Sequence, residues 1–269
     1  MFSCPSVPTL TSRMLFFAVL SLLFSSAVSL PPQSRLIVGG HPASIGDFPY
    51  FAYLRLKRSD GNYHECGGSL LNDRFILTAA HCVNNTSEEG DSEAFFGIVE
   101  GSQIGEPKTQ KSQIVAVRMT EKNPNNSPYD YEDIAVLKLK DPVKFSSSVY
   151  PIRILRKDEH LVTMRNTGTL AGYGTTTGDI HGQVSPHLLY VDVPFANHDY
   201  CRSLYGSTFD HTKFCAGAKG RGAAPGDSGG PIVTYDKHLA EVFLVGVVSG
   251  GLVPYDKGAK PGIQSALRS

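Results

Sequence analysis

The chain has 269 residues, and its 25 basic side chains are balanced by 25 acidic ones. This balance argues against nucleic acid and against an anionic membrane surface as partners, because both select strongly basic proteins. The length suits one large all-β domain or two small domains, and the apolar content is sufficient for a buried core.

The N-terminal segment predicts secretion. Arg13 supplies a positive charge ahead of an apolar run over residues 14–24, and Ala27-Val28-Ser29 has the small residues beside which signal peptidases cut. A transmembrane anchor is the alternative, but the run is shorter than the about 20 apolar residues that cross a bilayer. We expect a signal peptide at residues 1–29, a short propeptide at 30–36 and a secreted, extracellular protein without a membrane span.

The cysteines fit an oxidising compartment. Once the signal peptide has removed Cys4, four remain, and they allow three pairings. The two local pairings, Cys66 with Cys82 and Cys201 with Cys215, close short loops, and a bridge over about 15 residues is worth about 3 kcal/mol in the chain-entropy model. Free buried thiols are the alternative, which secretion disfavours. Glycosylation sequons also indicate an extracellular protein, at Asn84, Asn85 and Asn125.

From Ile37 onward the chain has the texture of a β protein. Short β-branched or aromatic runs alternate with clusters of Gly, Pro, Asn, Asp and Ser, and no long amphipathic helix stands out. We expect an antiparallel sandwich or barrel, with a connector over residues 140–151. The predicted strands are Phe51–Leu56, Arg74–Thr78, Phe95–Val99, Gln113–Arg118, Ile134–Leu139, Tyr190–Val193, Pro231–Tyr235 and Val242–Val248.

Four segments carry residues with catalytic chemistry: Ile37–Gly40, Leu77–Cys82, Asp133–Leu139 and Gly226–Pro231. A serine hydroxyl becomes a nucleophile when a base removes its proton, and imidazole can do so near neutral pH. A carboxylate on the other ring nitrogen holds the productive tautomer. Taken alone, His81 is one of nine histidines, Asp133 a residue at a strand end and Ser228 part of a turn. Their co-occurrence in these frames argues for catalysis.

These motifs, in the order His, Asp, Ser, resemble the trypsin/chymotrypsin family of serine proteases over residues 37 to about 263. The resemblance implies an all-β fold of two antiparallel six-stranded β-barrels with the active site in the cleft between them. The domain would span residues 37–269, divided into barrels at about 37–145 and 146–269. Cys82 after the histidine and Cys66 ahead of it agree with the family pattern.

The resemblance also implies roles for individual residues. Ser228 would attack the scissile carbonyl, His81 would act as general base and then general acid, and Asp133 would orient His81. The backbone N–H groups of Gly226 and Ser228 would form the oxyanion hole. A substrate-binding edge would follow, with Ser249 supporting the aspartate and Gly250 and Gly251 pairing with the extended substrate.

Activation is implied by the first and fourth motifs. Cleavage ahead of Ile37 would free an α-ammonium that pairs with buried Asp227 and sets the oxyanion loop. The junction departs from the family, because Leu36 lies between Arg35 and Ile37. Either the activator is not trypsin-like, or a second trimming step follows, or Leu36 is accommodated.

The predicted specificity pocket is also unusual. Gly222 stands where trypsin-like members have an aspartate, so a basic substrate side chain would find no buried counter-charge. Ala224 replaces one cysteine of the family's pocket bridge, and Gly250 replaces an aromatic residue. We therefore expect a preference for small or apolar residues before the cleaved bond, rather than Arg or Lys.

The alternative function is a protease homologue with a crippled site that acts as a secreted binding or inhibitor protein; a purely structural β domain is a third possibility. After Ile263 the family continues into a C-terminal helix, whereas this chain stops at Ser269, so we expect that covering helix to be missing or the gene model to be truncated. We expect no metal, because His and Cys lack ligand spacing, and no cofactor. The implied partners of the monomer are protein or peptide substrates, an activating protease and protein inhibitors.

Overall fold

The computed structural model describes residues 37, 39–86, 91–104, 106, 109–119, 132–155, 160–175, 182–251 and 261–267, all within one structural unit, residues 34–269. The expected signal peptide, the propeptide with its Arg35-Leu36 junction and the sequon at Asn125 lie outside the described residues. Among the described helices, none has the length and apolar character needed to cross a membrane.

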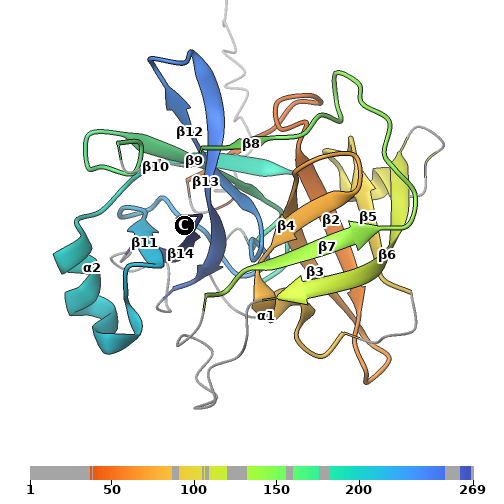
Figure 1. Ribbon diagram of the computed structural model, residues 1–269, viewed down its shortest axis with the longest axis horizontal. Helices are drawn as coiled ribbons and strands as arrows, with labels where there is room; N and C mark the ends of the chain where they lie inside the picture. Colours follow the sequence, from red (N-terminus) through yellow and green to blue (C-terminus); the bar gives the residue numbers. More distant parts are fainter. Residues whose placement is uncertain are drawn as a thin grey trace, which may run out of the picture. The chain divides into compact units, whose positions relative to one another are not determined.

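Six strands of the first half close into a barrel in the order β2-β3-β4-β7-β6-β5, with every neighbouring pair antiparallel (Figure 1). Closure leaves no edge strand with unpaired backbone groups. The elements are β2 (Phe51–Lys57), β3 (Tyr63–Leu70), β4 (Phe75–Thr78), α1 (Ala80–Val83), β5 (Glu93–Phe96), η1 (Gly101–Gln103), β6 (Gln110–Met119) and β7 (Ala135–Leu139).

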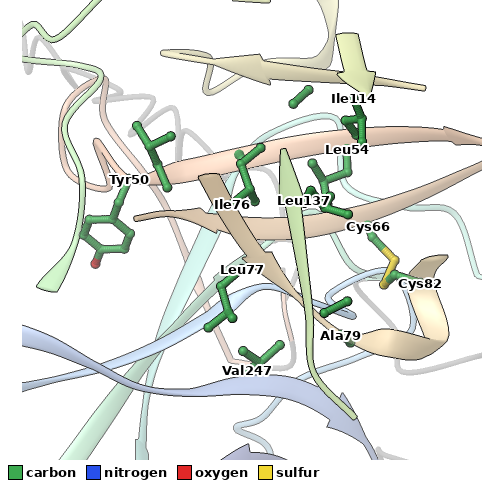
Figure 2. Packing of buried hydrophobic residues seen from close by; sticks show 14 of the residues in the cluster. Tyr50, Leu54, Cys66, Ile76, Leu77, Ala79, Cys82, Ile114, Leu137 and Val247 are labelled. Atoms are coloured by element: carbon green, nitrogen blue, oxygen red, sulfur yellow. A yellow bond between two sulfur atoms is a disulfide. The ribbon is translucent and has the colours of Figure 1, made fainter. Parts of the chain in front are cut away.

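The barrel forms because its strands present apolar side chains to one interior. In β7, buried Ala135, Leu137 and Leu139 alternate with more exposed residues, the period expected of a strand with one buried face. Figure 2 shows the resulting packing, in which Leu137 lies beside Ile76 and Leu54. Each fully buried aliphatic side chain contributes about 1.5–3 kcal/mol. The interior of the barrel is therefore the main core of the first half.

Seven strands of the second half and the N-terminal strand β1 form one sheet in the order β1-β10-β9-β12-β13-β14-β11, with β8 beside β13. The elements are β1 (His41–Pro42), β8 (Arg153–Ile154), β9 (Thr167–Gly172), β10 (Leu189–Pro194), α2 (His198–Tyr205), η2 (Gly206–Thr208), β11 (Lys213–Ala216), β12 (Pro231–Asp236), β13 (Glu241–Gly250) and β14 (Gly262–Ala266).

The outer strand β11 returns to the segment that follows β10. Phe195 forms a bridge with Ala216, the N–H of Gly217 donates to Pro194 O at 3.0 Å, and the N–H of Ala196 donates to Cys215 O at 2.9 Å. The strands β9 to β14 thus curl round on themselves, as a barrel requires. The expectation of a purely antiparallel six-stranded second barrel needs one correction, because β1 and β8 are additional and β8 pairs with β13 in parallel.

The two halves share part of their core. Val247 of β13 belongs to the same buried cluster as Leu77 of β4, and Figure 2 shows both side chains in one view. This contact packs β13 against the strand that leads directly into α1. The C-terminal end of β4 and the C-terminal half of β13 are thereby fixed close together, and both carry residues singled out in the sequence.

Candidate active site

His81 and Asp133 are held together by two hydrogen bonds. His81 lies on the short helix α1, immediately after β4, and Asp133 lies two residues before β7, which pairs with β4. The backbone N–H of His81 donates to Asp133 Oδ1 at 2.8 Å, and His81 Nδ1 lies 2.6 Å from Asp133 Oδ2. Because the carboxylate is an acceptor, Nδ1 carries the proton in this pair, so Nε2, which lies 3.9 Å from Cys82 Sγ, keeps its lone pair.

The Asp133 carboxylate accepts a third hydrogen bond from the other half of the molecule. Ser249, at the end of β13, donates its hydroxyl to Asp133 Oδ2 at 2.7 Å. Only 3% of Asp133 is exposed. Burial raises the pKa of its carboxyl, but the hydrogen bonds and charge of His81, together with the Ser249 bond, outweigh burial and hold that pKa below its usual range. Asp133 is therefore a charged, fully oriented anchor.

Ser228 lies in the loop between β11 and β12, and this loop is fixed from both sides. The N–H of Gly67 on β3 donates to Ser228 O at 2.8 Å, and the N–H of Gly229 donates to Val248 O on β13, also at 2.8 Å. Gly229 has φ +75°, and a Cβ there would lie only 2.5 Å from Gly67 O. Only glycine permits this backbone conformation and this approach to β3.

The loop has two candidate oxyanion donors. Gly226 has φ +97°, a conformation that favours glycine. Within the described part of the chain, the backbone N–H groups of Gly226 and Ser228 donate to no acceptor, whereas the neighbouring N–H of Asp227 donates to Ala224 O at 3.0 Å. Two free N–H groups flanking a bonded one are what a site for a developing oxyanion requires.

Both local disulfides are present in the structure. Cys66 pairs with Cys82, and Cys201 on α2 pairs with Cys215 on β11. The first bridge joins Cys82, which follows His81, to Cys66, which precedes Gly67. The N–H of Gly67 donates to Ser228 O. The bridge thus links the imidazole segment covalently to the strand that binds the serine loop. His64 lies near this bridge, with Nε2 3.4 Å from Cys66 Sγ, but two disulfide sulfurs offer no thiolate to a metal ion.

Comparison with known proteins identifies the chain's family. The family model described as Trypsin matches residues 37–267. The chain belongs to the trypsin family. It is 29% identical to U21-ctenitoxin-Pn1a of Phoneutria nigriventer over 80% of this chain and 89% of that protein. It is 28% identical to the heavy chain of a venom peptide isomerase of Agelenopsis aperta, over 87% of this chain and 96% of the relative.

Membership of the trypsin family confirms the two-barrel fold predicted from the four motifs and places the chain among trypsin-like serine proteases. The venom relatives and the disulfides also indicate an extracellular protein. One relative is named as a ctenitoxin and the other as part of a peptide isomerase, so the chemistry of this trypsin-family chain has to be argued from its own residues.

Within the described ranges, Asp227 is held by backbone N–H groups and by no charged side chain. Its carboxylate accepts from Gly174 N and from Ala224 N, both at 2.7 Å, and it is 1% exposed. Burial raises the pKa of Asp227 to about 7, although these two N–H groups favour the charged form. Ile37, the other predicted member of the activation pair, is fully buried and has φ +36°, an unfavourable conformation for a β-branched residue.

The predicted specificity pocket is only partly described, because residues 252–260 lie outside the described part of the chain. A Cβ added at Gly222 would meet nothing within 4 Å, so space is open above it. Ala224 is buried beside Asp227, and Gly250 pairs with Ile263 of β14, which places Gly250 and Gly251 at the end of β13.

Some residues of the site were missed in the sequence. Gly172 and Gly174 surround the carboxylate of Asp227, and a Cβ at either position would collide with it. The only sequence signal was the pair of glycines in Ala171-Gly172-Tyr173-Gly174. Thr78 was also missed; its hydroxyl donates to Gly67 O at 2.8 Å and so supports the strand that holds Ser228.

Proposed function

We propose that the chain is a secreted serine endopeptidase with His81, Asp133 and Ser228 as its catalytic triad. The observation that carries this proposal is the doubly bonded His81–Asp133 pair, closed by Ser249 from the opposite barrel. His81, Asp133 and Ser249 are far apart in the sequence and converge at this pair. The contact between His81 Nδ1 and Asp133 selects one tautomer of the imidazole. A structural histidine on the surface needs no such arrangement.

In the proposed reaction, Ser228 Oγ attacks the carbonyl carbon of the scissile bond while His81 Nε2 takes the hydroxyl proton. The proton then passes from Nε2 to the leaving amine, and the acyl group remains on Ser228 until water, activated in the same way, releases it. The N–H groups of Gly226 and Ser228 stabilise the oxyanion, a contribution of about 3–4 kcal/mol for each donor in comparable sites. Asp133 stabilises the imidazolium that forms in each half-reaction.

Activation follows from Asp227 and Ile37. Among the described residues of the uncleaved chain, only backbone N–H groups donate to the buried Asp227 carboxylate. Cleavage ahead of Ile37 creates an α-ammonium on that residue. The Ile37 side chain already lies in the buried core of the second barrel. Pairing this charge with Asp227 offsets the cost of burying the carboxylate and fixes the adjoining oxyanion loop. The cleavage also removes the backbone constraint that holds Ile37 at positive φ.

The substrate preference follows from Gly222. Gly222 supplies no carboxylate, and the space above it is open. A small or apolar substrate side chain before the cleaved bond can therefore be buried there without a desolvation penalty, whereas a buried Lys or Arg would lack a counter-charge. The same features, together with Ala224 and Gly250, are the departures that favour the second candidate, a secreted binding or inhibitor protein with weak or no activity.

A peptide library distinguishes these functions. The full-length chain, cleaved ahead of Ile37, is incubated with peptides and the products are read by mass spectrometry, with Ser228→Ala as the control. New termini after small or apolar residues, absent with the variant, support the endopeptidase; equal products from both proteins, or none, contradict it. Chromatography on a chiral phase detects mass-neutral isomerisation, the activity named for the Agelenopsis relative.

A further inference from the structure

A groove of about 500 Å³ lies on the first barrel. One part of its lining is the second half of β6, residues 114–119. Another part is formed by Val83 at the end of α1 and by Asn85 and Thr86, which follow this helix closely in the sequence. Leu56 of β2 also lines the groove. The proposed mechanism gives this groove no role.

Two of the exposed side chains in the groove are apolar. Val115 is 52% exposed and Met119 is 39% exposed, although both belong to a strand of a closed barrel. The strand is irregular at this point, because its register against β7 shifts between Ile114 and Ala116. Beneath the exposed pair the lining is also apolar, since Leu56 is almost completely buried. Apolar side chains that gather in a groove form the kind of surface that a further group covers.

Asn85 is an exposed member of this lining and begins the glycosylation sequon Asn85-Thr86-Ser87. The sequon of Asn84 overlaps it, and two neighbouring asparagines leave room for only one bulky glycan. The fold treats the two differently. Asn84 caps α1, its N–H donates to Ala80 O at 3.0 Å, and the residue is partly buried. Asn85 has φ +69°, a left-handed conformation that Asn tolerates better than most residues after a helix end.

The segment around Asn85 is fixed by its backbone and by Thr86. The carbonyl oxygen of Asn85 accepts from Ser59 N at 3.0 Å, and Thr86 forms a bridge with Arg58. The Thr86 hydroxyl donates to Val83 O at 3.0 Å, which connects the sequon to the end of α1. The contact at Asn85 itself uses the main chain, so a substituent on its side-chain nitrogen leaves that contact intact.

We propose that Asn85, rather than Asn84, carries an N-linked glycan whose first N-acetylglucosamine unit lies in this groove against Val115 and Met119. The volume of the groove lies within the range of small-ligand sites, about 300–1,000 Å³, and accommodates a sugar with its acetamido group. The mixed lining suits a sugar, because its C–H face packs on apolar side chains while its hydroxyl groups stay in contact with water. The glycan is thus a structural part of the first barrel.

The modification takes place in the secretory pathway, which the two disulfides indicate. The donor is an oligosaccharide carried on a lipid diphosphate. A C–N bond forms between Asn85 Nδ2 and the anomeric carbon of the first sugar, while the bond from that carbon to a diphosphate oxygen breaks. The lipid diphosphate leaves with the electron pair, and Nδ2 gives up one proton. The product is bulky and polar but uncharged.

Peptide mapping tests the position of the glycan. The full-length gene is expressed in a eukaryotic host, and the secreted protein is treated with a glycan-releasing amidase in water enriched in heavy oxygen. The amidase converts a glycosylated Asn into labelled Asp. We expect the label at Asn85 and none at Asn84. A label at Asn84, or at neither residue, overturns the proposal.

Two substitutions separate the overlapping sequons without changing Asn85. Asn84→Gln removes only the first sequon and Ser87→Ala only the second, whereas Ser87→Thr keeps both and is the matched control. We expect the glycan to persist on Asn85 in Asn84→Gln and in Ser87→Thr, and Ser87→Ala to be secreted without a glycan at either asparagine. Full occupancy of Asn84 in Ser87→Ala, with unchanged secretion, would show that the fold does not select Asn85.

Methionine supplies a direct readout for the groove. Met1 and Met14 lie in the predicted signal peptide, which leaves Met119 in the groove and Met164, 65% exposed and outside the groove lining, as an internal control. The wild-type chain and Ser87→Ala are produced with isotope-labelled methionine methyl groups and compared by NMR. We expect the Met119 resonance to differ between them and to show nuclear Overhauser contacts with the sugar only in the wild type. The Met164 resonance should be the same in both.

Melting curves provide a second measure of the groove contact. Ser87→Ala should melt about 2–4 °C below the wild type, whereas Ser87→Thr should match it. Trimming the wild-type glycan to its first sugar with an endoglycosidase should leave the melting temperature unchanged, because only that sugar touches the barrel. An unshifted Met119 resonance, or equal melting of wild type and Ser87→Ala, overturns the groove assignment. None of these readouts uses catalysis, so they hold independently of the proposed function.

Discussion

Ser249 and Asp133 are 116 positions apart in the sequence, and their side chains form a hydrogen bond of 2.7 Å. One partner ends β13 of the second barrel and the other precedes β7 of the first. The bond thus fixes the orientation of the carboxylate relative to both halves of the cleft. It also gives a third hydrogen bond to an anion that is almost completely buried.

Replacing Ser249 by Ala should therefore lower both stability and turnover. A hydrogen bond to a charged group contributes about 1.5–3 kcal/mol, and we expect a loss of that order in the free energy of unfolding. The carboxylate should be less firmly oriented toward His81, so kcat should fall. Urea denaturation and steady-state kinetics measure the two effects. Ser203→Ala removes a hydroxyl bonded only within α2 and should change neither; equal effects in both variants would refute the role of Ser249.

Asp227 should make the uncleaved chain less stable as pH rises. Burial raises its pKa to about 7 in the folded chain, so the folded state binds more protons than the unfolded state between about pH 4 and 7. Stability should fall across that window, by an amount on the order of 4 kcal/mol, and level off above it. Urea denaturation of the uncleaved Ser228→Ala chain at several pH values measures this slope.

Two comparisons control the Asp227 prediction. In Asp227→Asn the group no longer titrates, so the slope between pH 4 and 7 should disappear. After cleavage ahead of Ile37, the new ammonium should lower the pKa of Asp227, and the slope should shrink. A slope that is the same in all three proteins would show that another group is responsible.

Gly174→Ala should lower activity strongly without changing a proposed catalytic side chain. The added Cβ would lie 2.5 Å from Asp227 Cγ, which forces the carboxylate or the β9–β12 contact to move. Because Asp227 lies between Gly226 and Ser228, its displacement should disturb both oxyanion donors and lower kcat by about 10²-fold or more. Gly101→Ala is the matched control, since its nearest neighbour would be 3.7 Å away. Normal kcat in Gly174→Ala would contradict the need for this cradle.

Gln264 in β14 offers a stability prediction. It is completely buried, and neither Nε2 nor Oε1 has a hydrogen-bond partner among the described residues. An unsatisfied buried amide costs about 1–3 kcal/mol, and Met has a similar shape without that requirement. Gln264→Met should raise the midpoint of urea unfolding. A lower midpoint would mean that the amide is satisfied in solution.

The sequence predicted the strands well where they are rich in aromatic or aliphatic side chains. Phe51–Leu56 and Ile134–Leu139 correspond to β2 and β7 within a residue at most ends. The prediction of Phe95–Val99 was displaced, since β5 is Glu93–Phe96. Polar or glycine-rich strands were missed altogether, β3 above all. Glycine is depleted in strands, but a Cβ at Gly67 of β3 would lie 2.7 Å from Gly230 Cα, so close packing demands glycine there.

Helix α2 was missed for a different reason. It is short, and the residues that begin and end it are marked by capping interactions with their near neighbours in the sequence. Asn197 Oδ1 accepts from Asp199 N at 2.8 Å and from Tyr200 N at 3.3 Å, and Gly206 at φ +69° follows its last turn. These are ordinary capping signals that a pattern search could have found.

The candidate site was predictable in part. The motifs around His81, Asp133 and Ser228 identified which residues to examine, because catalytic chemistry restricts residue types. The support of Asp227 by Gly172 and Gly174 could not be read from the sequence, since it depends on the approach of β9 to the loop before β12. The same holds for the pocket of about 280 Å³ beside the serine loop, which is lined by residues of β2 and β3 and of the segments around Tyr173 and Gly226.

The central claim is that His81 makes the Ser228 hydroxyl nucleophilic. A fluorophosphonate probe tests it most directly, because the probe bonds covalently to an activated serine. We expect the full-length chain, once cleaved ahead of Ile37, to be labelled at Ser228 by peptide mapping, and the Ser228→Ala and His81→Ala variants to remain unlabelled. No labelling of a chain whose N-terminus has been verified as Ile37, or labelling that persists in His81→Ala, would contradict it.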